Sequence, residues 1–172
     1  MKFKLFVMLI IATLALSLPS KSVNAQSYNN AISGNLLGLA YYYQEFDVTY
    51  ENRVSARNSF TIKGYFFSGF GYYDAYGIGG SYRWYLKLIQ DNKSPLEGLS
   101  VGPMGMVLFW GSKWSGYKSS ATFAVGGEAA YKWVFDGFVV EPILTLGLNL
   151  MGIEGITYPV FGLGCNLGYA WN

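Results

Sequence analysis

Residues 161–172 read FGLGCNLGYAWN and alternate between two kinds of side chain along their whole length. One set of alternate positions carries Phe, Leu, Cys, Leu, Tyr and Trp, and the other carries Gly, Gly, Asn, Gly, Ala and Asn. The side chains of a β-strand point alternately to the two faces of a sheet, whereas an amphipathic helix repeats its pattern at intervals of three and four residues. The stretch therefore predicts a strand with one apolar face and one face of small or polar residues.

The same alternation recurs in residues 122–133 and 76–87, each about as long as a membrane-crossing strand, roughly 9–11 residues. Turn signals divide the remainder of the chain into similar pieces. We expect eight strands, at residues 30–40, 44–54, 58–70, 74–87, 98–112, 119–135, 138–150 and 158–172. An even number suits a single-chain bacterial barrel and puts both chain ends on the periplasmic side. The count depends on dividing residues 30–54 into two strands, because one long element there would leave seven.

The first 25 residues have the pattern of a cleaved secretory signal. Lys2 and Lys4 precede the 14-residue apolar or small-residue run from Leu5 to Leu18, and Val23-Asn24-Ala25 follows as a small-residue cleavage site. A membrane-spanning helix needs about 20 apolar residues. We therefore predict cleavage after Ala25 and one mature domain, residues 26–172.

The composition of the chain is unusual for an exported, water-soluble domain. Aromatic residues make up 19% of it and charged residues 13%, whereas charged residues normally make up about 25%. After the signal no apolar run is long enough for a spanning helix, and a closed barrel is the other structure that satisfies every backbone group in lipid. These observations predict an all-β, antiparallel up-and-down transmembrane barrel of eight strands, surrounded by the lipids of a Gram-negative outer membrane.

The charge balance argues against a nucleic-acid partner. Removing Lys2, Lys4 and Lys21 leaves nine Lys and Arg against ten Asp and Glu, a mature net charge of −1. Nucleic-acid-binding domains carry a basic patch or a strongly basic balance. The sequence therefore predicts no such partner.

Asp136-Gly137 stands between two alternating runs and predicts a two-residue hairpin turn. This turn pairs Phe135 with Phe138 and places Lys132 across from Glu141. In the same register Pro142 occupies a position that should donate a ladder hydrogen bond, which proline cannot do. A bulge near Pro142 would resolve the conflict, so the hairpin is predicted more firmly than its register.

The apolar set of positions is predicted to face lipid. An eight-stranded barrel has just enough interior room for its side chains, and small residues with a few charges fit there better than columns of large aromatics. Aromatic residues of such a barrel gather at the two membrane interfaces, and the chain places several near strand ends: Tyr82, Trp84, Trp133, Tyr169 and Trp171. The alternative is a soluble, secreted, lipocalin-like binding barrel with the two faces exchanged.

The inward set of positions then collects charges of both signs, namely Lys63, Arg83, Glu128, Lys132 and Glu141, with Asp47 and Glu51 as further members. A charge in a narrow lumen is costly unless it is paired. We interpret these residues as a structural network that closes the interior. The alternative is a narrow channel for ions or small solutes lined by the same charges.

The sequence contains no histidine and one cysteine, Cys165, which falls on the lipid-facing set of positions. Serine–histidine catalysis and zinc chemistry are therefore not expected. Glu128 and Glu141 on neighbouring strands are the remaining candidate acid–base pair, but Lys132 nearby gives both a structural role. The glycine-rich runs lack the following helix that would bind phosphate. We predict no catalytic, cofactor-binding or metal-binding residues and no enzyme activity.

Taken together, the signal, the eight alternating strands and the aromatic-rich final strand resemble small outer-membrane barrels of the OmpX and OmpA-transmembrane-domain type. Residues 35–60, NLLGLAYYYQEFDVTYENRVSARNSF, and residues 158–171, YPVFGLGCNLGYAW, resemble a broad family of such barrels whose function is not established. The resemblance implies that an aromatic near the C-terminus, here Trp171, aids recognition by the barrel-assembly machinery. Asn172 follows it, which departs from the usual terminal aromatic.

The function of such a barrel is expected to lie in its outer loops, near residues 40–44, 68–74, 111–119 and 151–158. Tyr and Trp combine apolar area with a polar group, which suits contact with a surface ligand; the candidate contacts are Tyr42, Tyr43, Tyr72, Tyr73, Trp114 and Tyr117, with Tyr41 and Phe70 beside them. The same aromatics also suit an interfacial belt on longer strands. We expect a non-catalytic outer-membrane protein with a structural or surface-interaction role, and the sequence does not identify a ligand.

Overall fold

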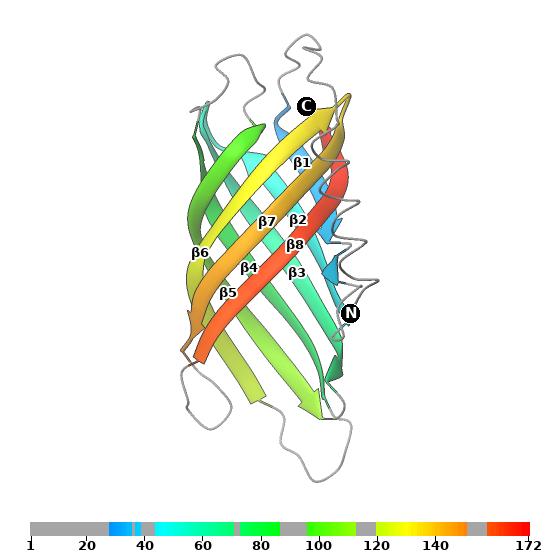
Figure 1. Ribbon diagram of the computed structural model, residues 1–172, viewed down its shortest axis with the longest axis vertical. Coiled ribbons are helices and arrows are strands. Elements are labelled where there is room, and N and C mark those ends of the chain that lie inside the picture. The colour runs from blue at the N-terminus through cyan, green and yellow to red at the C-terminus, as the bar shows by residue number, and fades with distance from the viewer. Residues whose placement is uncertain are drawn as a thin grey trace, which may run out of the picture.

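The computed structural model is a closed barrel of eight antiparallel strands that follow one another in chain order (Figure 1). It describes residues 28–35, 37–38, 44–70, 73–86, 96–112, 120–150 and 158–172. The strands are β1 (Asn30–Asn35), β2 (Gln44–Arg53), β3 (Asn58–Phe70), β4 (Tyr73–Leu86), β5 (Gly98–Ser112), β6 (Ser120–Phe135), β7 (Phe138–Asn149) and β8 (Tyr158–Trp171). The predicted fold class and strand count are confirmed.

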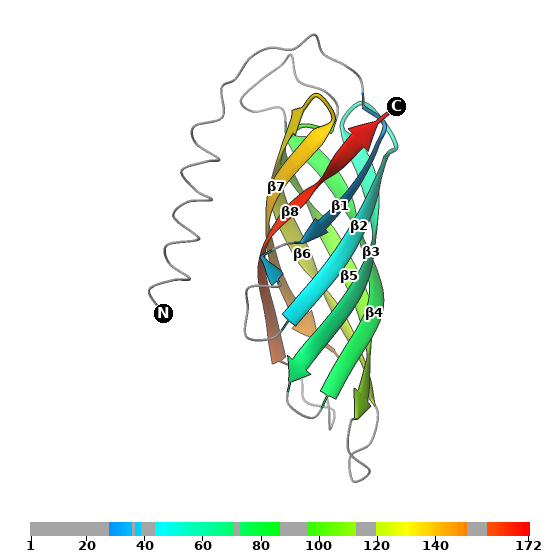
Figure 2. The same ribbon diagram turned by 90° about the vertical axis from the view of Figure 1, so that its right-hand side faces the viewer.

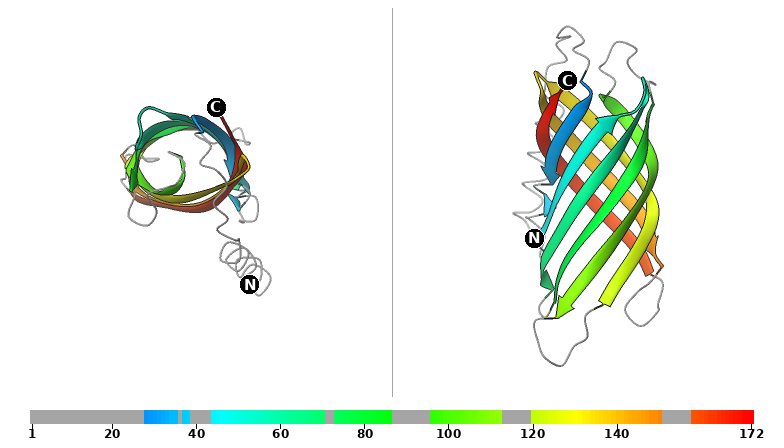
Figure 3. Two further views of the ribbon diagram at one scale, coloured as in Figure 1. Left: turned by 90° about the horizontal axis from the view of Figure 1, so that it is seen from above. Right: turned by 180° about the vertical axis from the view of Figure 1, so that it is seen from behind.

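Closure comes from the pairing of the first strand with the last. Ala31 on β1 is paired with Ala170 on β8 and with Glu51 on β2, so the sheet has no free edge at this point. Seen from above, the strands form a ring (Figure 3). A closed ring lets backbone groups that would line a sheet edge find partners in the neighbouring strand.

The division of residues 30–54 into two strands is confirmed, but the first strand is shorter than the predicted range 30–40. It ends at Asn35. The Asn35 side chain explains this end, because its Oδ1 accepts a hydrogen bond from the backbone N–H of Gly38 at 3.2 Å. A side-chain acceptor of this kind gives the backbone an alternative to the sheet ladder.

The predicted hairpin at Asp136-Gly137 is present. Both residues have positive φ, 51° for Asp136 and 88° for Gly137. A two-residue turn with positive φ at both positions matches the twist of the flanking strands. Phe135 is paired with Phe138, as the turn predicts.

The bulge considered near Pro142 is absent from the described strand pair. Ala130 pairs with Ile143 and Trp133 pairs with Val140, which is one continuous register. No extra residue is inserted between these two pairs. The regular strand pairing is instead interrupted at the two positions between them. Lys132 still reaches Glu141 across this gap, with 3.3 Å between Nζ and Oε1.

The two ends of the barrel differ. At one end, here called the terminus end, β8 stops at Trp171 and the β2–β3 and β6–β7 connections lie beside it (Figure 2). At the opposite end, here called the loop end, β8 begins and β3 gives way to β4. The predicted signal, residues 1–25, and the predicted cleavage after Ala25 lie outside the described residues.

Within the part of the chain that the structure describes, no helix has the length and apolar character needed to cross a membrane.

Candidate functional site

The outer wall of the barrel carries the apolar side chains. Phe161, for example, is 69% exposed. Large apolar residues are exposed on all eight strands or in the turns beside them, among them Ile32, Phe46, Ile62, Phe66, Tyr76, Ile78, Phe109, Phe123, Leu146 and Leu163. The apolar face therefore points outward, which contradicts the soluble, lipocalin-like arrangement, in which this face would point inward.

The predicted interfacial aromatics lie on this outer wall towards the terminus end. Tyr82, Trp84, Tyr169 and Trp171 are exposed and Trp133 is half-buried. Tyr82 and Trp84 pack edge to face, with ring centroids 5.5 Å apart. Another set of exposed aromatics lies towards the loop end, where the rings of Tyr76 and Phe109 stack with centroids 5.7 Å apart.

Cys165 departs from the lipid-facing position expected from its place in the alternation. The residue is 7% exposed. It lies across from Pro142 on β7, and its backbone N–H donates to Asn35 Oδ1 at 3.3 Å. The thiol expected to face lipid is therefore buried.

The lumen contains the seven charged residues that the alternation places inside. All are buried, and they come from five of the eight strands: Asp47 and Glu51 from β2, Lys63 from β3, Arg83 from β4, Glu128 and Lys132 from β6, and Glu141 from β7. Together they are four carboxylates and three cations. The structure thus brings together all five residues singled out as lumen charges and the two further members.

Arg83 is the centre of this cluster, and its side chain is fully buried. Its Nε donates to Glu128 at 2.5 Å, and its Nη1 donates to Glu51 at 2.9 Å and to Glu141 at 2.8 Å. The three carboxylates belong to β6, β2 and β7, none of which neighbours β4 in the sheet. Arg83 therefore joins different parts of the wall across the lumen.

Two lysines extend the cluster in opposite directions. Lys132 contacts Glu51 and Glu141, while Lys63 contacts Glu128. A buried charge needs hydrogen-bond partners as well as an opposite charge. Among the described residues, every one of these six side chains has at least two ionic contacts except Lys63, which has one.

Neutral hydroxyls complete the shell of the carboxylates. Ser59 and the Tyr85 hydroxyl donate to Glu51 at 2.5 and 2.6 Å, and Ser81 donates to Glu128 at 2.6 Å. These residues also lie on the inward set of positions, but their partners do not follow from the sequence. The sequence does offer one signal for these partners, namely a serine or tyrosine on the same inward-facing positions as the charged residues.

Two buried polar atoms lack a hydrogen-bond partner among the described residues, Arg83 Nη2 and Asn166 Oδ1. The Asn166 amide nitrogen donates to Glu141 Oε2 at 3.1 Å. A carboxylate oxygen accepts and does not donate, so this bond fixes which end of the Asn166 amide is left without a partner.

An apolar cluster lies between the charges and the terminus end. It contains Tyr28, Ala31, Tyr85, Leu96, Val139 and Ala170, with Val134 packed against it. Tyr85 belongs to both layers, because its ring packs in the apolar cluster while its hydroxyl donates to Glu51. The lumen is thus filled by an apolar layer followed by an ionic layer.

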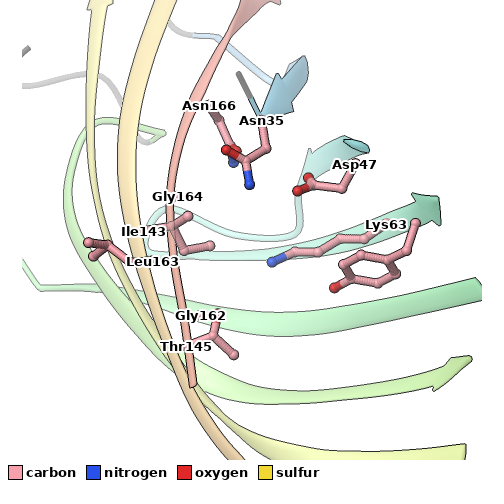
Figure 4. Close-up of a pocket in the computed structure, with 10 residues that line it drawn as sticks. Asn35, Asp47, Lys63, Ile143, Thr145, Gly162, Leu163, Gly164 and Asn166 are labelled. Carbon is pink, nitrogen blue, oxygen red and sulfur yellow. The ribbon is translucent and has the colours of Figure 1, made fainter. Parts of the chain in front are cut away.

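On the loop side of the ionic layer the lumen widens into a cavity of about 60 Å³. Its polar lining includes Asn35, Asp47, Lys63, Thr145 and Asn166. In the close-up, the Asp47 carboxylate and the Asn35 amide point towards one another and the Lys63 side chain runs beside them (Figure 4).

The remaining acid–base candidate pair does not face this cavity. Glu128 and Glu141 are buried, both accept hydrogen bonds from Arg83, and neither is among the cavity-lining residues. In the described part of the chain, no group of three or more His, Cys, Asp or Glu side chains is placed to hold a metal ion.

Of the predicted outer-loop contacts, one lies among the described residues. Tyr42, Tyr43, Tyr72, Trp114 and Tyr117 lie outside the described residues, and Tyr73 is described by its backbone, at the start of β4.

No family model matches this sequence, and no curated protein matches it. Among solved structures, the barrel is similar to the outer membrane protein Ail of Yersinia pestis in a phospholipid bilayer nanodisc, with a TM-score of 0.52 and 12% sequence identity. The match covers 85% of this chain and 100% of that chain. The expected resemblance to small outer-membrane barrels is therefore confirmed at the level of the fold.

Proposed function

We propose that this protein is an integral outer-membrane barrel with a closed lumen, and that it has a structural or surface-interaction role through its outer loops rather than a catalytic one. The observation that carries the proposal is the distribution of side chains, which is the reverse of that in a water-soluble protein. Charged residues are buried in the lumen, and aliphatic and aromatic residues cover the outer wall.

Such a wall is unsuited to water. Monomeric soluble proteins rarely expose a continuous apolar surface larger than a few hundred Å², whereas exposed apolar residues occur here around the whole barrel. An apolar band with aromatic girdles is the lipid-facing surface of an outer-membrane barrel. The similarity to the fold of a protein solved in a phospholipid bilayer is consistent with this environment.

The layers in the lumen favour a closed barrel over a narrow channel. An ion that crossed would have to pass the apolar cluster around Leu96 and Tyr85 and then separate Arg83 from its three carboxylates. Breaking a buried ion pair by removing a partner costs about 3–5 kcal/mol. We therefore favour a structural role for the charges.

Membrane insertion is tested by gel migration of the membrane fraction. The folded barrel should be recovered with outer membranes and should migrate differently before and after boiling. A product that stays soluble and monodisperse without detergent would contradict the proposal.

The closed lumen is tested separately in planar lipid bilayers. Purified protein should give no conductance above background, while an established porin in the same bilayers gives stepwise currents. Reproducible small conductance steps from this protein would favour the channel function instead.

A further inference from the structure

We propose that the lumen binds an uncharged sugar ring at its loop end, between a row of aromatic side chains and the polar cavity on the loop side of the ionic layer. The row, here called the aromatic row, consists of Tyr65, Phe67 and Trp110. The inference deepens the proposed surface-interaction role by naming a ligand class. It rests on that proposed role for placing the loop end outside the cell.

The aromatic row lies inside the barrel. Tyr65 and Phe67 occupy the same alternate positions of β3 as Lys63, which is buried in the lumen. A Cβ built on Gly79, which is paired with Lys63, would lie 2.9 Å from the Tyr65 ring. Paired residues share one face of a sheet, so this ring covers the inner side of β4. The aromatic row therefore lines the lumen and not the lipid-facing wall.

A small residue on β4 brings the rings together. Ala75, which is 0% exposed, is paired with Phe67 on one side and with Trp110 on the other. The ring centroids lie 6.2 Å apart for Tyr65–Phe67 and 6.4 Å apart for Phe67–Trp110, with interplanar angles of 15° and 23°. All three side chains are half-buried, so part of each ring is accessible. Nearly parallel rings form a continuous apolar surface, which suits the C–H face of a sugar ring.

Tyr65 connects the aromatic row to the polar cavity. It lines the cavity and is paired with Asp47 across β2 and β3. Asn35, Asn166 and Thr145 supply further polar groups on the opposite side of the cavity from the row. An apolar, aromatic surface that ends at a few convergent polar groups is the usual composition of a small-molecule site.

The charges of the cavity lining are already balanced. The Asp47 carboxylate faces the Lys63 ammonium and accepts from the Asn35 amide, which points towards it (Figure 4). Lys63 is in turn paired with Glu128. A charged ligand would compete for these partners, and a buried charge that loses its partner is costly. The lining therefore favours a ligand without charge.

The ligand must also donate hydrogen bonds. Asn166 is 2% exposed and lines the cavity, and its Oδ1 has no partner among the described residues. The amide nitrogen donates to Glu141, which fixes the oxygen as the end that needs a donor. Lys63, by contrast, carries three N–H donors and needs acceptors. A hydroxyl group both donates and accepts, so a polyhydroxyl ligand meets both requirements.

The size of the cavity determines how much of the sugar enters it. A single water takes up about 10–15 Å³ of such a volume, so the 60 Å³ of the cavity holds a few hydroxyl-sized groups. One hydroxyl-bearing edge of the ring therefore fits there. The face of the ring lies along the aromatic row, which runs from Tyr65 towards the loop end.

The test measures sugar binding to the mature protein in phospholipid nanodiscs, because detergents with sugar headgroups would compete. The probes are glucose, galactose, mannose and N-acetylglucosamine, and glucosamine and glucuronic acid are their positively and negatively charged comparisons. Saturation-transfer difference NMR should show saturable binding of at least one uncharged probe, with magnetisation reaching its ring C–H protons. The charged sugars should bind about tenfold more weakly. Empty nanodiscs give the background.

Phe67→Leu removes one ring from the aromatic row and should weaken binding by about two- to tenfold, as expected for one aromatic contact. Phe66→Leu is the matched control, since Phe66 is the next residue on β3 but is 49% exposed on the outer wall; it should keep the wild-type affinity. Thr145→Val removes a hydroxyl from the cavity with little change in shape and should also weaken binding. It replaces Phe67→Leu as the deciding variant if Phe67→Leu folds poorly.

Three results would overturn the inference: no saturable binding of any uncharged probe, equal or tighter binding of the charged sugars, or wild-type affinity in the deciding variant. Each of these leaves the proposed function standing if the same protein is recovered with outer membranes and migrates differently before and after boiling. A protein that fails that migration test counts against the barrel itself.

Discussion

Arg83 on β4 and Glu141 on β7 are joined by a hydrogen-bonded ion pair of 2.8 Å between Nη1 and Oε1, although their strands are not neighbours in the barrel. Neighbouring strands are already held by backbone hydrogen bonds. An ion pair between distant strands adds a constraint that the sheet lacks, because it fixes the cross-section of the lumen.

Replacing Arg83 should therefore destabilise the whole barrel. Arg83→Met leaves Glu51, Glu128 and Glu141 without their shared partner, and removing one member of a buried ion pair costs about 3–5 kcal/mol. The measurement is urea unfolding in detergent or lipid, followed by tryptophan fluorescence. Arg83→Lys is the control and should lose less, since it retains the charge; a wild-type midpoint for Arg83→Met would show that the cluster does not support the fold.

Charge on the outer wall should be tolerated according to its depth in the membrane. Ile78 is exposed near the middle of β4, whereas Val54 is exposed in the turn after β2. Lysine on the lipid face costs about 2–4 kcal/mol at the bilayer midplane and about 0–1 near the interfaces. Ile78→Lys should thus lower the free energy of unfolding in phospholipid vesicles far more than Val54→Lys. Equal effects would mean that the middle of β4 does not face hydrocarbon.

Gly102 should not accept a side chain. A Cβ built at this position would lie 1.8 Å from the backbone oxygen of Tyr82, an atom that cannot move without displacing β4. Overpacking costs about 1–3 kcal/mol, and we expect Gly102→Ala to reach or exceed that range in urea unfolding. Gly64→Ala is the matched control, since its Cβ would meet nothing within 4 Å. Similar stability of the two variants would contradict the close approach of β4 and β5.

The buried position of Cys165 predicts slow chemical modification. It is the one cysteine in the sequence, so labelling reports on a single site. A membrane-permeant maleimide should react slowly with the folded barrel and rapidly after heat unfolding. A cysteine placed at exposed Val54 in a Cys165→Ser background should react rapidly in both states. Equally fast labelling of folded Cys165 would show that this part of β8 is accessible.

The alternation along the chain predicts a great deal of this structure. The ranges 58–70 and 98–112 match β3 and β5 to the residue, because period-two patterns and turn residues are local properties. The same pattern assigns the charges to one face of each strand, and the structure buries them there.

What the alternation cannot supply is the relative position of strands that are not neighbours. The contacts of Arg83 with β2, β6 and β7 depend on how the strands tilt and stagger around the closed ring. The alternation of side chains within one strand does not determine that geometry. Cys165 is covered for a related reason, since its exposure depends on the size of the residues beside it on other strands. The Asn166 amide oxygen has no partner among the described residues, and its orientation follows from the hydrogen bond that the amide nitrogen donates to Glu141.

The shortest of the described strands completes the wall of the barrel. β1 contains 6 residues, and it is the element that joins β2 to β8. If it were displaced, two rows of backbone amides would face hydrocarbon at once, and each unsatisfied group there costs several kcal/mol (about the cost of burying a bare amide). β1 and β8 lie at opposite ends of the sequence, so the wall closes only when the two ends of the chain pair.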